Sequence, residues 1–180
     1  SNRVLAIVRD ITDRKKKEKE MEFLSLHDPL TGLHNRAFFE RKMQELTNQS
    51  VSPMGLIMCD LDGLKIINDS FGHETGDVVL TLAAGIIKKC VDKTDVVARV
   101  GGDEFAIILP RSSKDRTEHV CECIRSAVFQ YNDSQKKGLP LSLSIGYAFT
   151  AEDSFDITEL FKEADNNMYR EKLHKSQSIR

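Results

Sequence analysis

The sequence predicts an α/β fold in which helices cover a mostly antiparallel sheet. A chain of 180 residues is long enough for one domain with a substantial core and a short appendage. With 40% hydrophobic and 30% charged residues, its composition is that of a globular protein. β-prone apolar runs also alternate with amphipathic helical patterns in the order β-α-α-β-β-α-β-α, which is typical of helices packed on a sheet.

The chain begins with an appendage that precedes the domain. Residues 1–13 hold a short β-prone apolar run, Val4 to Val8, followed by residues suited to capping a helix. Residues 14–27 carry charges of both signs, which favours a solvated linker helix over a nucleic-acid-binding arm. We place the domain itself at residues 28–176 and a short tail at residues 177–180.

The domain opens with Asp28-Pro29, which resembles a helix cap followed by proline at the first helical position. Thr31-Gly32-Leu33 then marks a turn, and a helix is predicted from about Asn35 to Leu46. Met54 to Asp60 is an apolar run typical of a buried strand that ends in a carboxylate, and residues 62–70 can form a short helix behind it. The chain is thus expected to pass from a buried strand through an acidic turn into a helix.

The middle of the domain combines a long helix with a hairpin. From Thr75 to Cys90, apolar residues recur at a spacing of four, as on a helix face that packs on a sheet. Val96 to Val100 and Phe105 to Leu109 are strand patterns joined through Gly101-Gly102. This arrangement predicts a β-hairpin with acidic residues at its tip.

The last third of the chain completes the sheet and its cover. Glu118 to Tyr131 is a further amphipathic helix, Leu141 to Ala148 alternates like a strand, and Ile157 to Leu173 is a closing helix. We find no internal repeat.

Charge and hydropathy exclude several classes of function. Because 26 basic and 28 acidic side chains leave a net charge of −2, no global field would hold the chain on nucleic acid, and an anionic ligand must be bound locally. No apolar run approaches the roughly 20 residues that cross a bilayer, so we expect no membrane segment in this fragment and a cytoplasmic location. The four cysteines are expected to be reduced thiols, because Cys121-x-Cys123 lacks the spacing of common zinc sites.

Three carboxylates are the strongest candidates for chemistry. Asp60 ends a predicted strand, and Asp103 and Glu104 lie at the predicted hairpin tip, so neighbouring strands would bring them close together. Oxygen ligands in this arrangement suit Mg²⁺, and two such ions can activate a hydroxyl and stabilise a leaving pyrophosphate. The alternative is a hairpin with acids on a solvated tip. Gly101-Gly102 can adopt positive φ and let backbone amides approach a phosphate.

The surrounding motifs decide between these interpretations. Arg99-Val100-Gly101-Gly102-Asp103-Glu104-Phe105 follows Asp60-Leu61-Asp62-Gly63-Leu64-Lys65-Ile66-Ile67-Asn68-Asp69 by about forty residues. Further motifs are Asp28-Pro29-Leu30-Thr31-Gly32-Leu33-His34-Asn35-Arg36, Phe71-Gly72-His73-Glu74-Thr75-Gly76-Asp77 and Ala164-Asp165 through Tyr169 to Lys172. With these four motifs the sequence resembles the GGDEF family of diguanylate cyclases from about Asp28 to Lys172. The resemblance implies a fold like that of nucleotidyl cyclases and polymerase palms, with the acidic motif on a β-hairpin.

The resemblance also implies a metal site. Asp60 and Asp103 would be metal ligands through their side chains, and Leu61 through its carbonyl oxygen. Glu104 would complete the site or help to remove the proton from an attacking 3′-hydroxyl, for which a carboxylate beside Mg²⁺ is suited. The implied cofactor is Mg²⁺ or Mn²⁺, with two ions per active site.

Other matched positions imply a binding site for GTP. Asn68 and Asp77 match the positions that recognise guanine. A carboxylate can accept hydrogen bonds from the two adjacent N–H groups on the edge of guanine, and adenine does not present that pair of donors. Lys65 and Lys172 would meet the triphosphate as point charges. Taken singly, such an Asn or Asp is more often a helix cap and such a lysine is more often solvated.

Two departures from the family pattern affect the expected regulation and substrate binding. Where product-inhibited members carry Arg-x-x-Asp, this chain has Asp92-Lys93-Thr94-Asp95; without the guanidinium we expect no high-affinity inhibitory site, although Asp95 is retained. Near the end, the residues after Lys172 differ from a common Gly-Arg-Asn ending, so Lys175 is a candidate to replace a phosphate-binding arginine in part.

The predicted function is that of a diguanylate cyclase, a nucleotidyltransferase that condenses two GTP into cyclic di-GMP and two pyrophosphates across a homodimer. Residues 1–13 resemble the end of a PAS sensory domain, so an upstream sensor could drive pairing through the linker helix. The alternative function is a non-catalytic GTP-binding regulatory module. A different cyclase or polymerase palm is disfavoured by Asn68, Asp77 and the lack of a basic surface.

Overall fold

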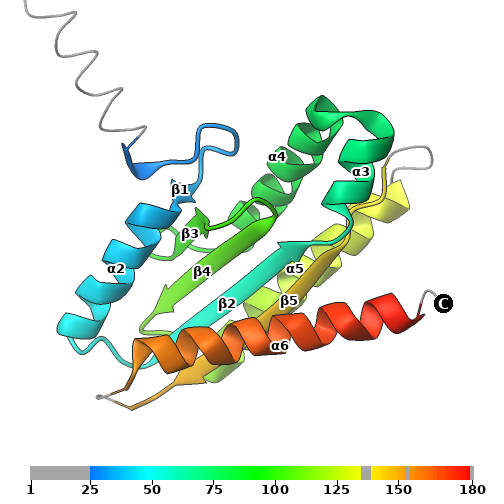
Figure 1. Ribbon diagram of the computed structural model, residues 1–180. Coiled ribbons are helices and arrows are strands. Elements are labelled where there is room, and N and C mark those ends of the chain that lie inside the picture. The colour runs from blue at the N-terminus through cyan, green and yellow to red at the C-terminus, as the bar shows by residue number, and fades with distance from the viewer. Residues whose placement is uncertain (1–24, 135–138, 153–154, 179–180) are drawn as a thin grey trace, which may run out of the picture.

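The computed structural model describes residues 25–134, 139–152 and 155–178, and these form a five-stranded mixed sheet with helices on both faces (Figure 1). This architecture confirms the predicted fold class. The strand predicted within residues 1–13 and most of the predicted linker helix lie outside the described residues. In chain order the elements are β1 (His34–Asn35), α2 (Arg36–Asn48), β2 (Met54–Leu61), α3 (Leu64–Phe71), α4 (His73–Lys89), β3 (Val96–Arg99), β4 (Glu104–Pro110), α5 (Lys114–Ser134), β5 (Leu143–Thr150) and α6 (Ile157–Ser178).

The sheet has the strand order β1-β3-β4-β2-β5. The central strand β2 runs antiparallel to both β4 and β5, and β3 and β4 form the predicted antiparallel hairpin. Only β1, which pairs His34 with Ala98 of β3, is parallel to its neighbour. The sequence did not predict β1, because a two-residue strand exists only through pairing with a segment more than sixty residues away.

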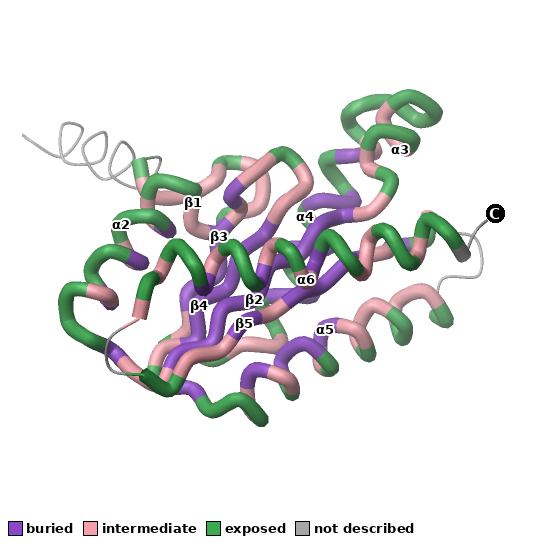
Figure 2. The backbone as a smooth tube through the Cα atoms, turned by 60° about the horizontal axis from the view of Figure 1, so that its bottom comes forward, coloured by how far each residue is buried: buried purple, intermediate pink, exposed green. Residues whose placement is uncertain are grey.

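Helices α2 and α6 cover one face of the sheet, and α4 and α5 cover the other (Figures 1 and 2). All eight residues of β2 are buried, as expected for a strand covered on both faces. Its alternate side chains point to opposite faces: Ile57 packs with the α4 and α5 side chains, whereas Leu56 packs with those of α2 and α6. The two apolar layers hold β2 rigidly up to its carboxyl end, where Asp60 lies.

Several predicted boundaries differ from the structure. Asp28 does not cap a helix; its carboxylate accepts hydrogen bonds from the backbone N–H and the hydroxyl of Thr31, so it closes a turn. Helix α6 continues to Ser178, beyond the predicted end at Leu173 and into the predicted tail. None of the helices in the described ranges is both long enough and apolar enough to cross a membrane.

Candidate active site

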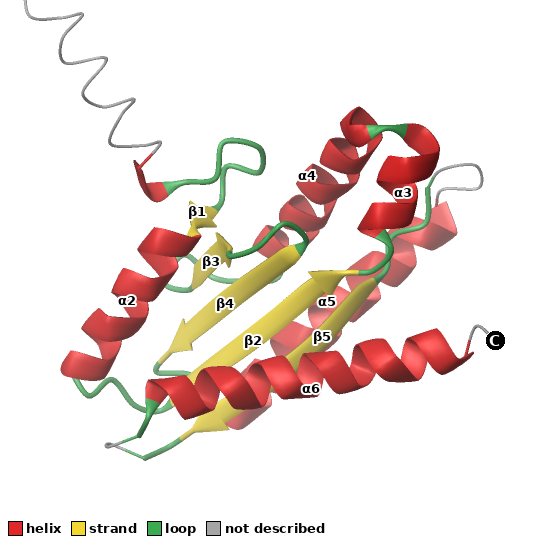
Figure 3. Cartoon of the chain, viewed as in Figure 1, coloured by secondary structure: helices red, strands yellow, loops and turns green. Residues whose placement is uncertain are grey.

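The end of β2 lies beside the loop that precedes β4 (Figure 3), and the strand register brings the three predicted acids together at this edge of the sheet. Asp60 and Glu104 are direct partners in the β2–β4 register. The N–H of Leu61 donates to the carbonyl oxygen of Asp103 at 2.9 Å, which attaches the turn to the end of β2. The backbone pairing therefore assembles this acidic cluster, which we define as Asp60, Asp103 and Glu104.

Asp60 is the most buried member of the acidic cluster, with 5% of its surface exposed. Burial raises the pKa of its carboxyl group, and the nearby charges of Asp103 and Asp62 act in the same direction. The ammonium of Lys172 on α6 opposes them, donating to Asp60 Oδ1 at 2.7 Å. Burial lowers the pKa of Lys172, but the hydrogen bond and charge of Asp60 outweigh it, so its pKa is raised. Lys172 is thus held charged against the cluster.

Glu104 shares this crowding of negative charge. Burial raises the pKa of its carboxyl group, and the charges of Asp103, Asp60 and Asp165 raise it further. Glu104 lies over Gly101, where a Cβ would come within 2.3 Å of Glu104 Oε2. The close approach explains this glycine; the expected positive φ is wrong for both Gly101 and Gly102, since the glycines with positive φ in the described residues are Gly32, Gly63 and Gly72.

The donor set of the acidic cluster fits a divalent cation that also binds a nucleotide. Within the described ranges, no three His, Cys, Asp or Glu side chains are gathered closely enough to ligate a metal by themselves. Mg²⁺, however, is usually bound by one or two carboxylates together with water and substrate phosphates. Asp60 and Asp103, two carboxylates at the end of β2 and in the turn before β4, match that mode.

The predicted guanine-binding residues are brought together by the packing of α3 and α4. Asn68 lies on α3 and Asp77 on α4, one residue after Gly76. A Cβ on Gly76 would come within 2.0 Å of Asn68 Oδ1, so the glycine allows the two helices to meet at this point. Asn68 Oδ1 is buried without a hydrogen-bond partner, and Asp77 is exposed. An unpaired buried acceptor beside an exposed carboxylate is suited to a ligand that donates.

The two predicted phosphate-binding lysines differ in their surroundings. Lys172 contacts Asp60, whereas Lys65 on α3 is exposed to solvent. The ammonium of Lys175, the candidate to replace the missing arginine in part, donates to the carbonyl oxygen of Leu143 at 2.6 Å and lies 3.3 Å from Asp62 Oδ2, and its role at the phosphates stays a prediction. Its partners lie beside the acidic cluster rather than in it.

The ion pair between Arg99 and Asp28 holds the turn that carries Asp103. Arg99 donates to the carbonyl oxygen of Gly102 at 2.6 Å through Nη2 and lies 3.3 Å from Asp28 Oδ1 through Nη1. Asp28 in turn fixes the Thr31 turn at the domain's start. Both residues belong to the motifs quoted above, but the sequence did not indicate that they contact each other, because seventy-one positions separate them.

A second acidic pair lies apart from the site, on the loop between α4 and β3. Arg116 on α5 donates to Asp95 Oδ2 at 2.6 Å and to Asp92 Oδ2 at 2.8 Å, and Asp95 Oδ2 also accepts from the N–H of Asp92. The side chain of Asp95 is only 1% exposed. The residue that matches the family's inhibitory aspartate therefore serves the fold here, and the absence of a high-affinity inhibitory site stays a prediction.

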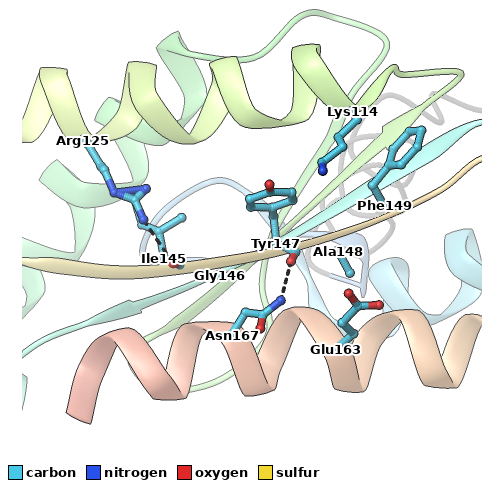
Figure 4. A pocket seen from close by; sticks show the side chains of 9 residues that line it. All are labelled: Lys114, Arg125, Ile145, Gly146, Tyr147, Ala148, Phe149, Glu163 and Asn167. Carbon is cyan, nitrogen blue, oxygen red and sulfur yellow. Dashed lines mark hydrogen bonds between the residues drawn. The ribbon is translucent and has the colours of Figure 1, made fainter. Parts of the chain in front are cut away.

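One of the cavities, of about 380 Å³, lies between α5, β5 and α6 (Figure 4). Three of its polar side chains are already engaged: Asn167 donates to the Tyr147 carbonyl oxygen at 2.9 Å, Tyr147 is hydrogen-bonded to Glu118, and Arg125 contacts Glu171. None of the predicted site residues lines it. The cavity is therefore not the candidate active site.

Comparison with known proteins shows the family of the chain. The family described as "Diguanylate cyclase, GGDEF domain" matches residues 25–178. The chain is 39% identical over 175 residues to diguanylate cyclase DgcM of Escherichia coli (strain K12), covering 94% of this chain and 41% of that protein. It is 38% identical to diguanylate cyclase DgcP of Pseudomonas aeruginosa, covering 82% of this chain and 22% of the relative. The chain therefore spans well under half the length of these curated relatives.

Solved structures agree on the fold. A structure of the GGDEF domain of TpbB (YfiN) from Pseudomonas aeruginosa matches with a TM-score of 0.70 and 35% identity, covering 82% of this chain and 89% of that one. The coiled coil and GGDEF domain of DgcB from Caulobacter crescentus, in complex with c-di-GMP, matches with a TM-score of 0.80 at 24% identity, covering 92% and 90%. Because the family match covers most of the chain, this protein belongs to the GGDEF diguanylate cyclase family.

Proposed function

We propose that this domain condenses two GTP molecules into cyclic di-GMP with release of two pyrophosphates. The observation that carries the proposal is the acidic cluster at one edge of the sheet, with the Lys172 ammonium 2.7 Å from Asp60. In each half-reaction a 3′-hydroxyl oxygen forms a bond to an α-phosphorus, the bond from that phosphorus to pyrophosphate breaks, and the hydroxyl proton is transferred to a base. The diguanylate cyclase relatives support this activity.

The proposed cofactor is Mg²⁺ or Mn²⁺, two ions per active site, held by the side chains of Asp60 and Asp103 and the carbonyl oxygen of Leu61. When bound, such ions neutralise the phosphate charge and lower the pKa of the attacking hydroxyl. Glu104 either completes the ligand set or accepts the hydroxyl proton. Its raised pKa suits a base, because proton transfer is most efficient when the pKa of the base approaches the working pH.

The remaining residues bind and orient GTP. Lys172 and Lys65 are the proposed triphosphate contacts, and Gly102 leaves open space at the turn, since a Cβ on it would meet nothing within 4 Å. The unpaired Asn68 Oδ1 and the Asp77 carboxylate supply acceptors for the N–H groups of guanine. Adenine lacks that donor pair, so GTP is the preferred substrate.

The reaction requires two domains to face each other. One site holds one GTP, so each 3′-hydroxyl must reach an α-phosphate bound by a second copy, and catalysis depends mainly on positioning and charge neutralisation. We infer a homodimer as the active state. An upstream PAS-like sensory region acting through residues 14–27 stays a prediction, since residues 1–24 lie outside the described ones.

The proposal is tested by incubating the purified chain with GTP and Mg²⁺ at several protein concentrations and separating the products by chromatography. We expect cyclic di-GMP that rises more than linearly with protein, and none from the Asp103→Ala/Glu104→Ala variant. GTP binding without product, even for a chain forced to dimerise by a fused coiled coil, would instead identify a non-catalytic GTP-binding regulator.

A further inference from the structure

Helix α6 lies along the sheet (Figure 1), and its C-terminal half is joined to the end of β2 and the residue after it by two ion pairs. Lys172 pairs with Asp60, and Lys175, one turn further along the helix, pairs with Asp62. Residues three apart on a helix lie on the same face, so both ammonium groups point to the same side of α6. Only the first pair belongs to the site described above.

Asp62 is bound on both carboxylate oxygens. Oδ1 accepts from the Ser144 hydroxyl at 2.7 Å, and Oδ2 accepts from the Ser142 hydroxyl at 2.7 Å and from Lys175 at 3.3 Å. Ser144 is fully buried, and its backbone is the register partner of Asp60. Asp62 is therefore fixed to β5 close to the strand end that carries Asp60. Because both of its carboxylate oxygens are engaged, neither is free to bind a phosphate or a metal.

Lys175 is fixed equally well. Its ammonium donates to the carbonyl oxygen of Leu143 at 2.6 Å and lies 3.1 Å from Glu171 Oε1, in addition to its contact with Asp62. Glu171 is in turn hydrogen-bonded to Arg125 of α5. Charges of alternating sign thus run from Arg125 on α5 through Glu171 and Lys175 on α6 to Asp62 after β2, and Lys172 directly follows Glu171 in the sequence.

We propose that Asp62 and Lys175 are positioning residues for Lys172. Their pair fixes α6 along its axis and in rotation, so that the Lys172 ammonium remains at the edge of the acidic cluster, where the triphosphate is proposed to bind. A long lysine side chain loses much rotational freedom on binding, and a fixed helix lowers that cost at the moment the substrate arrives. This inference rests on the proposed function of Lys172.

Binding of a non-hydrolysable GTP analogue and of GMP, measured by calorimetry, tests the proposal without turnover. Lys175→Met keeps the aliphatic stem and removes the charge. We expect it to weaken binding of the triphosphate by about tenfold, as for groups that orient a ligand-binding residue, and to leave GMP binding within about twofold. Lys175→Arg, which keeps the charge, restores triphosphate binding, and Lys162→Met, on an exposed stretch of α6, serves as the matched control.

Whether Asp62 and Lys175 act through Lys172 is tested in a chain that already carries the Lys172→Met substitution. In Lys172→Met, adding Lys175→Met or Asp62→Asn should cause no further loss of triphosphate affinity, because non-additivity is expected for residues that act through one another. Equal weakening of GMP and triphosphate, or full additivity, would show a general structural role and overturn the inference. If the wild-type chain bound no triphosphate at all, the proposed function would fail instead.

Discussion

Two clusters of acidic side chains in this domain differ in how far their negative charge is offset by neighbouring groups. At the loop between α4 and β3, Asp92 and Asp95 share one guanidinium and a backbone N–H, so their charge is offset in part within the chain, although Asp95 Oδ1 is buried without a hydrogen-bond partner. In the acidic cluster, mutual repulsion and burial raise the pKa values of Asp60 and Glu104, and a single lysine offsets them. Compensated acids stabilise a loop, whereas uncompensated acids are retained at a cost in stability and require a cation.

The comparison predicts that an Asp→Asn substitution lowers activity in the acidic cluster, whereas it lowers stability at the loop between α4 and β3. In the acidic cluster, Asp103→Asn removes a proposed metal ligand while keeping the shape of the side chain. We expect cyclic di-GMP formation to fall by about a thousandfold, the range found for loss of a key electrostatic group, with little change in the melting temperature. A steady-state assay and a thermal melt on the same sample measure both quantities; retained activity would contradict the assignment.

In the compensated cluster, Asp95→Asn leaves Arg116 without its most buried partner. We expect a loss of about 2 kcal/mol in the free energy of unfolding, less than for a fully buried pair because the Arg116 side chain is 30% exposed. Chemical denaturation measures the loss, and activity per folded molecule should be unchanged. Calorimetry with cyclic di-GMP adds a check: tight binding to the wild-type chain that Asp95→Asn abolishes would show an inhibitory site and refute the structural assignment.

The Asp28–Arg99 pair extends the comparison to the pH dependence of the free energy of unfolding. Although burial raises the pKa of Asp28, hydrogen bonds from Thr31 and the charge of Arg99 lower it overall below the ordinary value of 3.8. A carboxylate with a lowered folded-state pKa contributes stability above its unfolded pKa, and this contribution disappears as the pH falls through the folded-state pKa. We therefore expect Asp28→Asn to cost about 1 kcal/mol at pH 7 and progressively less below about pH 4. Urea denaturation at several pH values tests this; a cost independent of pH would show that the charge of Asp28 is not involved.

Local pattern was sufficient for most of the fold, and motifs indicated the core of the site. The buried run ending in Asp60 and the two strands flanking Gly101-Gly102 were predicted where β2, β3 and β4 lie. The β3–β4 hairpin is specified by alternation and turn chemistry, whereas β2 pairs with β4 across two intervening helices, so the meeting of Asp60 with Asp103 and Glu104 was expected from the motifs and not from local pairing. The motif residues Asn68 and Asp77 were also identified without coordinates.

The same reasoning failed where a residue's partner is distant in sequence. Arg116 gave no signal, because an arginine on an amphipathic helix is usually solvated, yet it offsets the charge of Asp92 and Asp95 in part. The sequence did not indicate that Lys175, a candidate phosphate ligand, contacts Asp62 and Leu143. The glycine of the acidic turn was attributed to positive φ, whereas close approach of the Glu104 side chain accounts for Gly101.

The sequence by itself determined the α/β class, the order of the main elements and the family, because these depend on periodicity and on motifs within short stretches; the residues that hold metal and guanine stay predictions from those motifs. Only the tertiary structure decided which acids have their charge offset by a neighbour, which lysine reaches the acidic cluster and how α6 is held against β2. Those properties depend on distances between side chains such as Asp60 and Lys172, which are 112 positions apart in the chain and 2.7 Å apart in space. Packing of the helices on both faces of the sheet creates these contacts, and no local pattern specifies them.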